Sequence, residues 1–153
     1  MPGRPEAGDG RPVGQAAAPW YREGLRFSCL ACGACCTGGP GYVWVSDEEI
    51  ERIAAFLGLE RAVFRRRYLV LGYRGYSLRE KAGYDCVFLD GGRCTIYPVR
   101  PRQCRSFPFW PETLRSRADW ERFARDCPGM NHGRLYSLEE IREVLEGRKD
   151  VVR

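Results

Sequence analysis

The chain has 153 residues, a formal net charge of +5, eight cysteines and a single histidine. This length favours one domain with a modest core, and metal sites that need two or three histidines are excluded within one chain. The sequence shows no secretory signal and no apolar run of about 18 residues, so we expect a cytoplasmic protein without membrane association. The positive charge comes almost wholly from arginine but forms no long basic run, so we expect no specific nucleic-acid partner.

We divide the chain into three segments. Residues 1–19 are rich in Gly, Pro and Ala and lack apolar periodicity, which predicts a disordered N-terminal tail. Residues 20–136 contain every cysteine and form the expected metal-binding domain. In residues 137–153, Ser137 followed by Glu140 predicts a capping box at the start of a C-terminal helix, which a short tail follows.

The first half of the domain carries signals for one strand and two helices. Residues 42–45 are apolar and aromatic, which predicts a brief strand. Ser46 with Glu49 three positions later predicts a capping box, and apolar residues at helical spacing continue the helix to about Leu57. A second helix is expected over about residues 60–69.

The second half is expected to be more irregular. The turn residues 90–92, Asp-Gly-Gly, predict a β-hairpin with arms over residues 86–89 and 94–97. A short helical piece should carry Cys104, and residues 118–125 should form a helix. These elements predict an α+β fold, a small irregular cysteine-rich metal-binding domain with short β-hairpins and several short helices.

The cysteines carry the strongest chemical signal in the sequence. Four of them fall within eight residues in a C-x2-C-x2-C-C pattern, and four more follow later in the chain. Two residues between thiols let a tight turn direct both sulfurs at one metal. Cytoplasmic thiols stay reduced, so we favour metal binding over a disulfide scaffold. The candidate ligands are Cys29, Cys32, Cys35, Cys36, Cys86, Cys94, Cys104 and Cys127.

Eight thiols exceed the four that one metal ion takes, which leaves two four-thiolate sites or one polynuclear cluster. Neighbouring residues of an extended chain point to opposite faces, so we expect Cys35 and Cys36 to serve two metals, or different irons of one cluster. Arginines near the later cysteines could offset the thiolate charge, or could be ordinary surface residues. They are Arg93, Arg100, Arg102 and Arg105.

The order of the cysteine motifs resembles that of a known family. The motifs are Cys29-x2-Cys32-Gly33-x-Cys35-Cys36, the Cys86 to Tyr97 segment with Cys94, Arg100-Pro101-x-Gln103-Cys104-Arg105-x-Phe107-Pro108-Phe109, and Cys127-Pro128-Gly129. From about Phe27 to Gly133 the chain is similar to the YkgJ-type cysteine-cluster family, also called the CxxCxxCC zinc- or iron-chelating domain. The resemblance implies that all eight cysteines ligate metal. The family includes a domain of flagellin lysine N-methylases, although no binding loop for a methyl donor is identified here.

We therefore predict a metal-binding protein that holds zinc or an iron–sulfur cluster, with a 4Fe–4S cluster favoured among cluster types. One alternative is a cluster-dependent enzyme, methyltransferase-related or an oxidoreductase. In that case residues 107–110 and the arginine-rich segment around Cys104 would line a substrate site. Another alternative is a structural zinc module that presents an interaction surface. Redox activity separates these functions, because zinc has none. The sequence identifies no protein partner.

Overall fold

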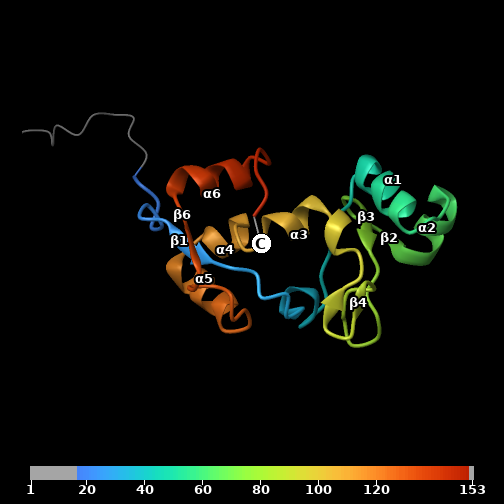
Figure 1. Cartoon of the computed structure of the whole chain (residues 1–153), viewed down its shortest axis with the longest axis horizontal. Helices are drawn as coiled ribbons and strands as arrows, with labels where there is room; N and C mark the ends of the chain where they lie inside the picture. Colours follow the sequence, from blue (N-terminus) through green and yellow to red (C-terminus); the bar gives the residue numbers. More distant parts are fainter. Residues whose placement is uncertain (1–16, 152–153) are drawn as a thin grey trace, which may run out of the picture.

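The computed structural model describes residues 17–151, so most of the predicted N-terminal tail lies outside the described residues. Within them, residues 17–19 have no regular structure. The chain forms two lobes that lie end to end (Figure 1). Each lobe has its own cluster of buried apolar side chains, where the sequence analysis expected a single core. No helix within residues 17–151 is long and apolar enough to span a membrane.

The first lobe, at the left of Figure 1, combines the start of the domain with the C-terminal part of the chain. Trp120 and Tyr136 are fully buried at its centre, and the ring of Phe109 stacks on Trp120 with 6.0 Å between centroids. Trp120 Nε1 donates a 2.7 Å hydrogen bond to Asn131 Oδ1, so the buried indole is satisfied. The elements are β1 (Leu25–Phe27), α4 (Pro111–Leu114), α5 (Arg117–Ala124), β6 (Arg134–Tyr136) and α6 (Leu138–Leu145), with β1 antiparallel to β6.

The second lobe contains the middle of the chain. Its first helix starts at the predicted capping box, in which Ser46 Oγ accepts from Glu49 N and the Glu49 carboxylate accepts from Ser46 N. Ile50 and Ile53 of this helix are buried in one cluster with Phe64 of the next. The elements are α1 (Asp47–Phe56), α2 (Arg61–Tyr68), β2 (Leu69–Gly72), β3 (Gly75–Leu78), β4 (Leu89–Asp90), β5 (Arg93–Cys94) and the 3-10 helix η2 (Tyr97–Val99).

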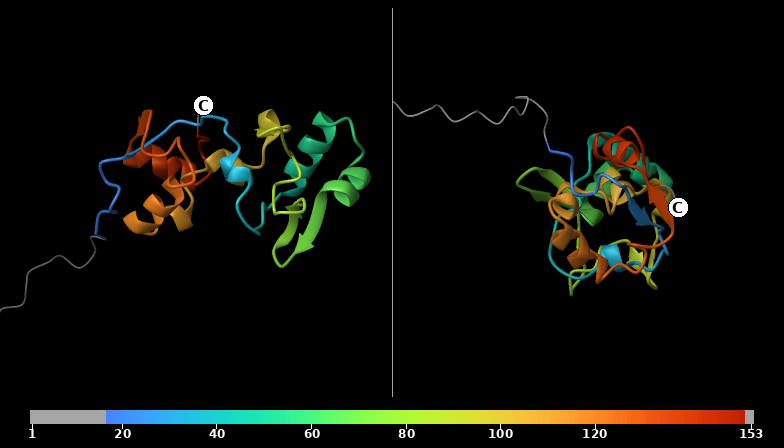
Figure 2. Two further views of the ribbon diagram at one scale, coloured as in Figure 1. Left: turned by 90° about the horizontal axis from the view of Figure 1, so that it is seen from below. Right: turned by 90° about the vertical axis from the view of Figure 1, so that its left-hand side faces the viewer.

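Two short helices lie between the lobes. The 3-10 helix η1 (Ala34–Cys36) comes from the first cysteine run, and α3 (Arg102–Ser106) carries Cys104. Figure 1 and the left view of Figure 2 place these two helices at the junction of the lobes. The residues that carry most of the cysteine chemistry therefore lie where the two lobes meet.

The α+β class and most helices agree with the sequence analysis. The capping box at Ser137 and Glu140 begins α6, α5 covers the expected segment, and α3 is the predicted short helix. The hairpin at residues 90–92 is also confirmed, although β4 and β5 have only two residues each. Gly91 and Gly92 adopt positive φ values of 53° and 74°, which the tight turn requires.

One expectation about strands is corrected by the structure, and strands that the sequence analysis did not name are present. Residues 42–45 form only a bridge from Trp44 to Ser77, which backbone bonds from Val45 N to Tyr76 O and from Leu78 N to Val43 O flank. The pairing goes no further because the Val43 amide donates to the side chain of Ser77. The second expected helix is confirmed as α2 to within one residue at each end, and the residues after it form β2, which pairs with β3. Strand β6 was not predicted at all.

Candidate metal centre

All eight cysteines line one cavity of about 360 Å³ at the junction of the lobes. Cys127 belongs to the buried cluster of the first lobe and Cys29 packs against that cluster, whereas Cys86 and Cys94 pack against the cluster of the second lobe. Cys32 and Cys35 are exposed, Cys127 is buried and the others are partly buried. All eight thiols are free. The four sequence motifs thus converge, as expected of a common site.

The first cysteine run is held in place by a close backbone contact with the hairpin. Gly33 has a φ of 76° and precedes η1, and a Cβ at this position would lie 2.7 Å from the carbonyl oxygen of Gly92. Only glycine fits both the left-handed conformation and this spacing. The hydrogen bond from Cys86 N to Cys36 O, of 2.7 Å, joins the same two segments a second time.

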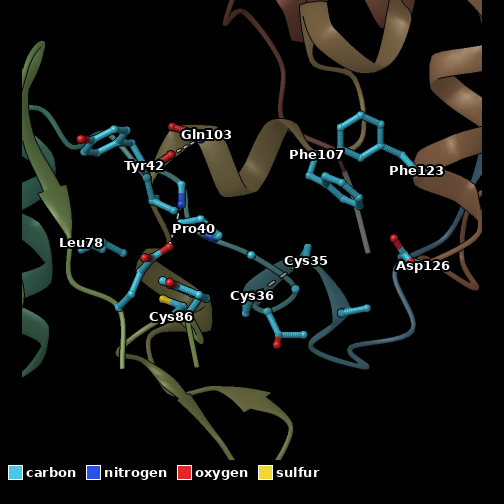
Figure 3. A pocket seen from close by; sticks show the side chains of 18 of the residues that line it. Cys35, Cys36, Pro40, Tyr42, Leu78, Cys86, Gln103, Phe107, Phe123 and Asp126 are labelled. Atoms are coloured by element: carbon cyan, nitrogen blue, oxygen red, sulfur yellow. Dashed lines mark hydrogen bonds between the residues drawn. The ribbon is translucent and has the colours of Figure 1, made fainter. Parts of the chain in front are cut away.

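Cys35 and Cys36 do not point to opposite faces of an extended chain. The Cys36 amide donates to Gly33 O at 2.9 Å, which winds these residues into η1 and brings the two Sγ atoms to 3.9 Å (Figure 3). The expectation of two faces was wrong because it assumed an extended backbone. Both thiols line the same cavity.

The acidity of the thiols differs within the cavity. The hydrogen bond from the Cys36 thiol lowers the pKa of Cys35 to about 7, with smaller help from the Cys35 backbone amide and Arg100. The same bond, together with burial and the nearby Cys35 charge, raises the pKa of Cys36. Burial raises the pKa of four further thiols, namely those of Cys86, Cys94, Cys104 and Cys127.

Two of the four arginines considered from the sequence line the cavity. These are Arg93 and Arg100. Arg100 is oriented by Tyr97, since its Nε donates to Tyr97 O at 3.0 Å and its guanidinium lies 3.6 Å from the Tyr97 ring centroid. Tyr97 in turn directs its hydroxyl at Cys29 Sγ, 3.9 Å away. The other two arginines contact the C-terminal region instead, Arg102 through Leu145 O and Arg105 through Asp150.

The donor set of the cavity consists of sulfur. Among the described residues, its lining includes no histidine and no carboxylate. Such a set fits soft metals and iron–sulfur groups and not magnesium or calcium. Within residues 17–151, no three cysteine, histidine or acidic side chains are placed to hold a single ion. His132 is exposed and does not line the cavity.

A larger cleft of about 780 Å³ adjoins the cysteine cavity. The two spaces share four cysteines and two apolar residues, namely Cys35, Cys36, Cys86, Cys127, Leu78 and Phe107. Trp110 also lines the cleft, so part of the aromatic loop considered as a substrate wall is in position, whereas Phe109 is buried in the first core. Figure 3 shows Phe107, Phe123 and Asp126 toward one end, Tyr42 and Leu78 toward the other, and Cys35 and Cys36 between them. Sequence reasoning did not find Phe123 and Asp126, because no motif marks them.

Comparison with known proteins assigns the chain to a family. Residues 28–128 match the family model CxxCxxCC, described as “Putative zinc- or iron-chelating domain”. The chain belongs to this family, as the cysteine motifs indicated. It is 34% identical over 122 residues to an uncharacterised protein of Methanocaldococcus jannaschii, an alignment that covers 74% of this chain and 63% of that protein. The chain thus spans less than two thirds of the length of this relative. No solved structure matches.

Proposed function

We propose that the cysteine cavity holds a metal centre ligated by the thiolates of all eight cysteines. The observation that carries this proposal is the convergence of four separate motifs on one cavity with an all-sulfur donor set. Thiolates select zinc or iron–sulfur groups over hard cations. The proposed ligands are Cys29, Cys32, Cys35, Cys36, Cys86, Cys94, Cys104 and Cys127. Because such thiols must stay reduced, we further propose a cytoplasmic location.

The size of the cavity favours a polynuclear group. Its volume of about 360 Å³ equals that of roughly a dozen waters at about 30 Å³ each, far more than one ion needs. A single tetrahedral zinc needs four sulfurs about 2.3 Å from the ion, hence about 4 Å from one another. Cys35 and Cys36 meet that spacing, but no third ligand joins them in the described residues. Iron–sulfur ligation is therefore favoured, with zinc as the alternative. Because a 4Fe–4S cluster takes four cysteines, the eight thiolates correspond to two such clusters.

The surrounding residues are suited to a negatively charged centre. Arg93 and Arg100 line the cavity, and their charges oppose those of the thiolates. Tyr97 both holds Arg100 and directs its hydroxyl at Cys29. When bound, an iron–sulfur centre would supply one-electron redox chemistry, whereas zinc closed by four thiolates would supply structural support without redox chemistry.

Serine variants test the ligand set. Cys35→Ser, Cys86→Ser and Cys127→Ser each remove one thiol from a different motif. Each is expected to lower the metal content per chain or the affinity for metal by tenfold or more, since a hydroxyl is a poor ligand for soft metals. His132→Ala changes an exposed side chain outside the cavity and serves as the control that keeps its metal. Unchanged metal content and affinity in all three serine variants would rule out the proposed ligands.

A second candidate function is a cluster-dependent enzyme, methyltransferase-related or an oxidoreductase. The cleft beside Cys35 and Cys36 favours it, because a purely structural centre needs no such opening. The metal-loaded protein would then change its absorption spectrum on adding a reductant, an oxidant or a methyl donor. A centre that responds to none of these would instead favour the structural zinc module.

A further inference from the structure

The cleft next to the cysteine cavity has a size and position that the metal centre alone does not explain. Its volume of about 780 Å³ lies within the range of small-molecule sites, roughly 300–1,000 Å³. It adjoins the cysteine cavity and includes Cys35, Cys36, Cys86 and Cys127 in its lining. A molecule in this cleft would therefore lie against the ligands of the proposed centre.

One end of the cleft is aromatic. Phe107 and Trp110 pack edge to face with 5.0 Å between ring centroids, and Phe123 of α5 lines the same cleft. Trp110 Nε1 already donates to Gln103 O at 2.8 Å and to Ser106 Oγ at 3.1 Å. The indole therefore has no further hydrogen-bond donor for a ligand. What these three side chains offer is ring surface, which attracts cations and apolar groups.

The same end carries a carboxylate without a partner. Asp126 is exposed and lines the cleft three residues after Phe123, and its side chain forms no hydrogen bond or ion pair within residues 17–151. The other acidic residue of the lining, Glu80, already accepts from the Gly41 amide at 2.9 Å. Asp126 is thus the lining carboxylate that remains available to a ligand.

The proposed metal centre carries negative charge, as the carboxylate of Asp126 does. Four thiolates around a divalent ion leave about two net negative charges, and the cleft shares four cysteines with that centre. Arg79 and Arg125 also line the cleft and offset the charges of Glu80 and Asp126, so the net negative sign comes from the proposed centre. The carboxylate, the rings and the centre together favour a positively charged guest.

We propose that this cleft binds a small organic cation whose ammonium group lies between Asp126 and the rings of Phe107, Trp110 and Phe123. The proposal rests on the metal centre for part of its electrostatic argument. The ammonium would gain an ionic contact and a cation–π contact, and the apolar remainder would lie along the aromatic wall toward Cys35. The bound organic cation would then lie next to the proposed metal centre.

Three probes of the same shape but different charge test this proposal. Choline is cationic, 3,3-dimethylbutan-1-ol is its neutral carbon counterpart, and 3,3-dimethylbutanoate is anionic. Each has a single methyl resonance whose broadening by the purified full chain gives a dissociation constant. Choline is expected to bind at least about fivefold more tightly than the neutral alcohol. This ratio of dissociation constants corresponds to the free energy of a partly desolvated cation–π contact. Equal binding, tightest binding of the anion, or no binding of any probe would overturn the proposal.

Variants locate the binding to this end of the cleft. Asp126→Asn and Phe123→Leu should each weaken choline binding by about threefold to tenfold without changing affinity for the alcohol by as much. Glu112→Gln removes an exposed carboxylate outside the cleft and should leave both affinities unchanged. Wild-type affinity for choline in Asp126→Asn would place any binding elsewhere and overturn the assignment.

Metal analysis of the same samples separates the two proposals. Loss of the choline preference in protein that carries its full metal content would overturn the cation site and leave the metal centre intact. A choline preference in protein that never binds metal would overturn the metal centre and leave the cation site intact.

Discussion

The backbone amide of Cys86 donates a 2.7 Å hydrogen bond to the carbonyl oxygen of Cys36. This bond connects two cysteine motifs that lie 50 positions apart in the sequence. Gly33 meets Gly92 in the same region, so the first cysteine run is fixed against the hairpin by backbone contacts as well as by side chains. The protein therefore sets the relation between these ligands through its own fold, which leaves less ordering for the metal to impose.

Gly33→Ala should disrupt this arrangement. The positive φ at this position would destabilise the folded state by about 1–2 kcal/mol with alanine, and the alanine Cβ would also lie 2.7 Å from Gly92 O. We expect a loss of stability in chemical denaturation together with a fall in metal content.

Gly58→Ala is the matched control, because Gly58 has a φ of 66° but no atom near the added Cβ. It should lose a similar amount of stability for its backbone conformation and keep its metal. Equal metal content in Gly33→Ala and Gly58→Ala would contradict the role of the Gly33 contact.

Removal of the metal should loosen the junction of the lobes. Cys29 and Cys127 pack with the first core, whereas Cys86 and Cys94 pack with the second, so a shared centre would link the two. Structural zinc contributes on the order of 10 kcal/mol to folding in small peptides, so a lower melting temperature is expected after chelation.

Hydrogen exchange locates this effect. Exchange should rise most in η1, α3 and the loop after Cys127, with smaller changes at Trp120 and Ile53 inside the two cores. A metal-free protein with the same exchange pattern and melting temperature would show that the centre does not join the lobes.

Metal uptake should release protons. The pKa values of Cys86, Cys94, Cys104 and Cys127 are raised, chiefly by burial, and that of Cys36 is raised by its bond to Cys35 and by burial, so these five thiols are protonated at pH 7 in the metal-free protein. Because the ligating form is the thiolate, each should lose about one proton on binding, and Cys35, with its pKa of about 7, about half of one. The apparent affinity should then fall as the pH decreases, by about tenfold per pH unit for each proton. Calorimetry in buffers of different ionisation enthalpy measures the count, and zero proton release would be inconsistent with thiol ligands.

Asp119 should contribute to the acid resistance of the first lobe. Hydrogen bonds from Arg115 and Ser116 lower the pKa of its carboxyl to about 2. Since an unfolded aspartate has a pKa of about 3.9, the stabilisation is present above about pH 4 and is lost as the pH falls toward 2. Asp119→Asn should therefore melt at a lower temperature at pH 7 and match the parent near pH 2. If the melting temperatures of the variant and the parent differed by the same amount from pH 7 to pH 2, the titration of Asp119 would be excluded as the cause.

Local signals in the sequence were sufficient for the parts of the fold that local interactions determine. Ser46 with Glu49 and Ser137 with Glu140 form the predicted capping boxes, and the glycines at 91 and 92 form the predicted turn. In each case the residues that make the structure lie within four positions of one another. The family could also be read from the order of the cysteine motifs, which the family model confirms.

Long-range pairing accounts for what the sequence did not reveal. β6 has only Tyr136 buried and so no alternating pattern, and it forms because β1 pairs with it from the other end of the chain. The division into two cores also depends on β1 joining the C-terminal elements. Phe123 and Asp126 come together with Phe107 only through this packing, so no spacing rule could have marked the cleft.

Analysis of metal and acid-labile sulfide in protein purified without oxygen tests the central claim most directly. We predict brown protein that contains iron and sulfide in similar amounts, with a content that falls in Cys35→Ser, Cys86→Ser and Cys127→Ser. Colourless protein with one or two zinc ions per chain would keep the cysteine centre and replace the cluster by zinc. Folded protein that contains neither metal, and binds neither after reconstitution, would contradict the assignment of the cysteine cavity as a metal centre.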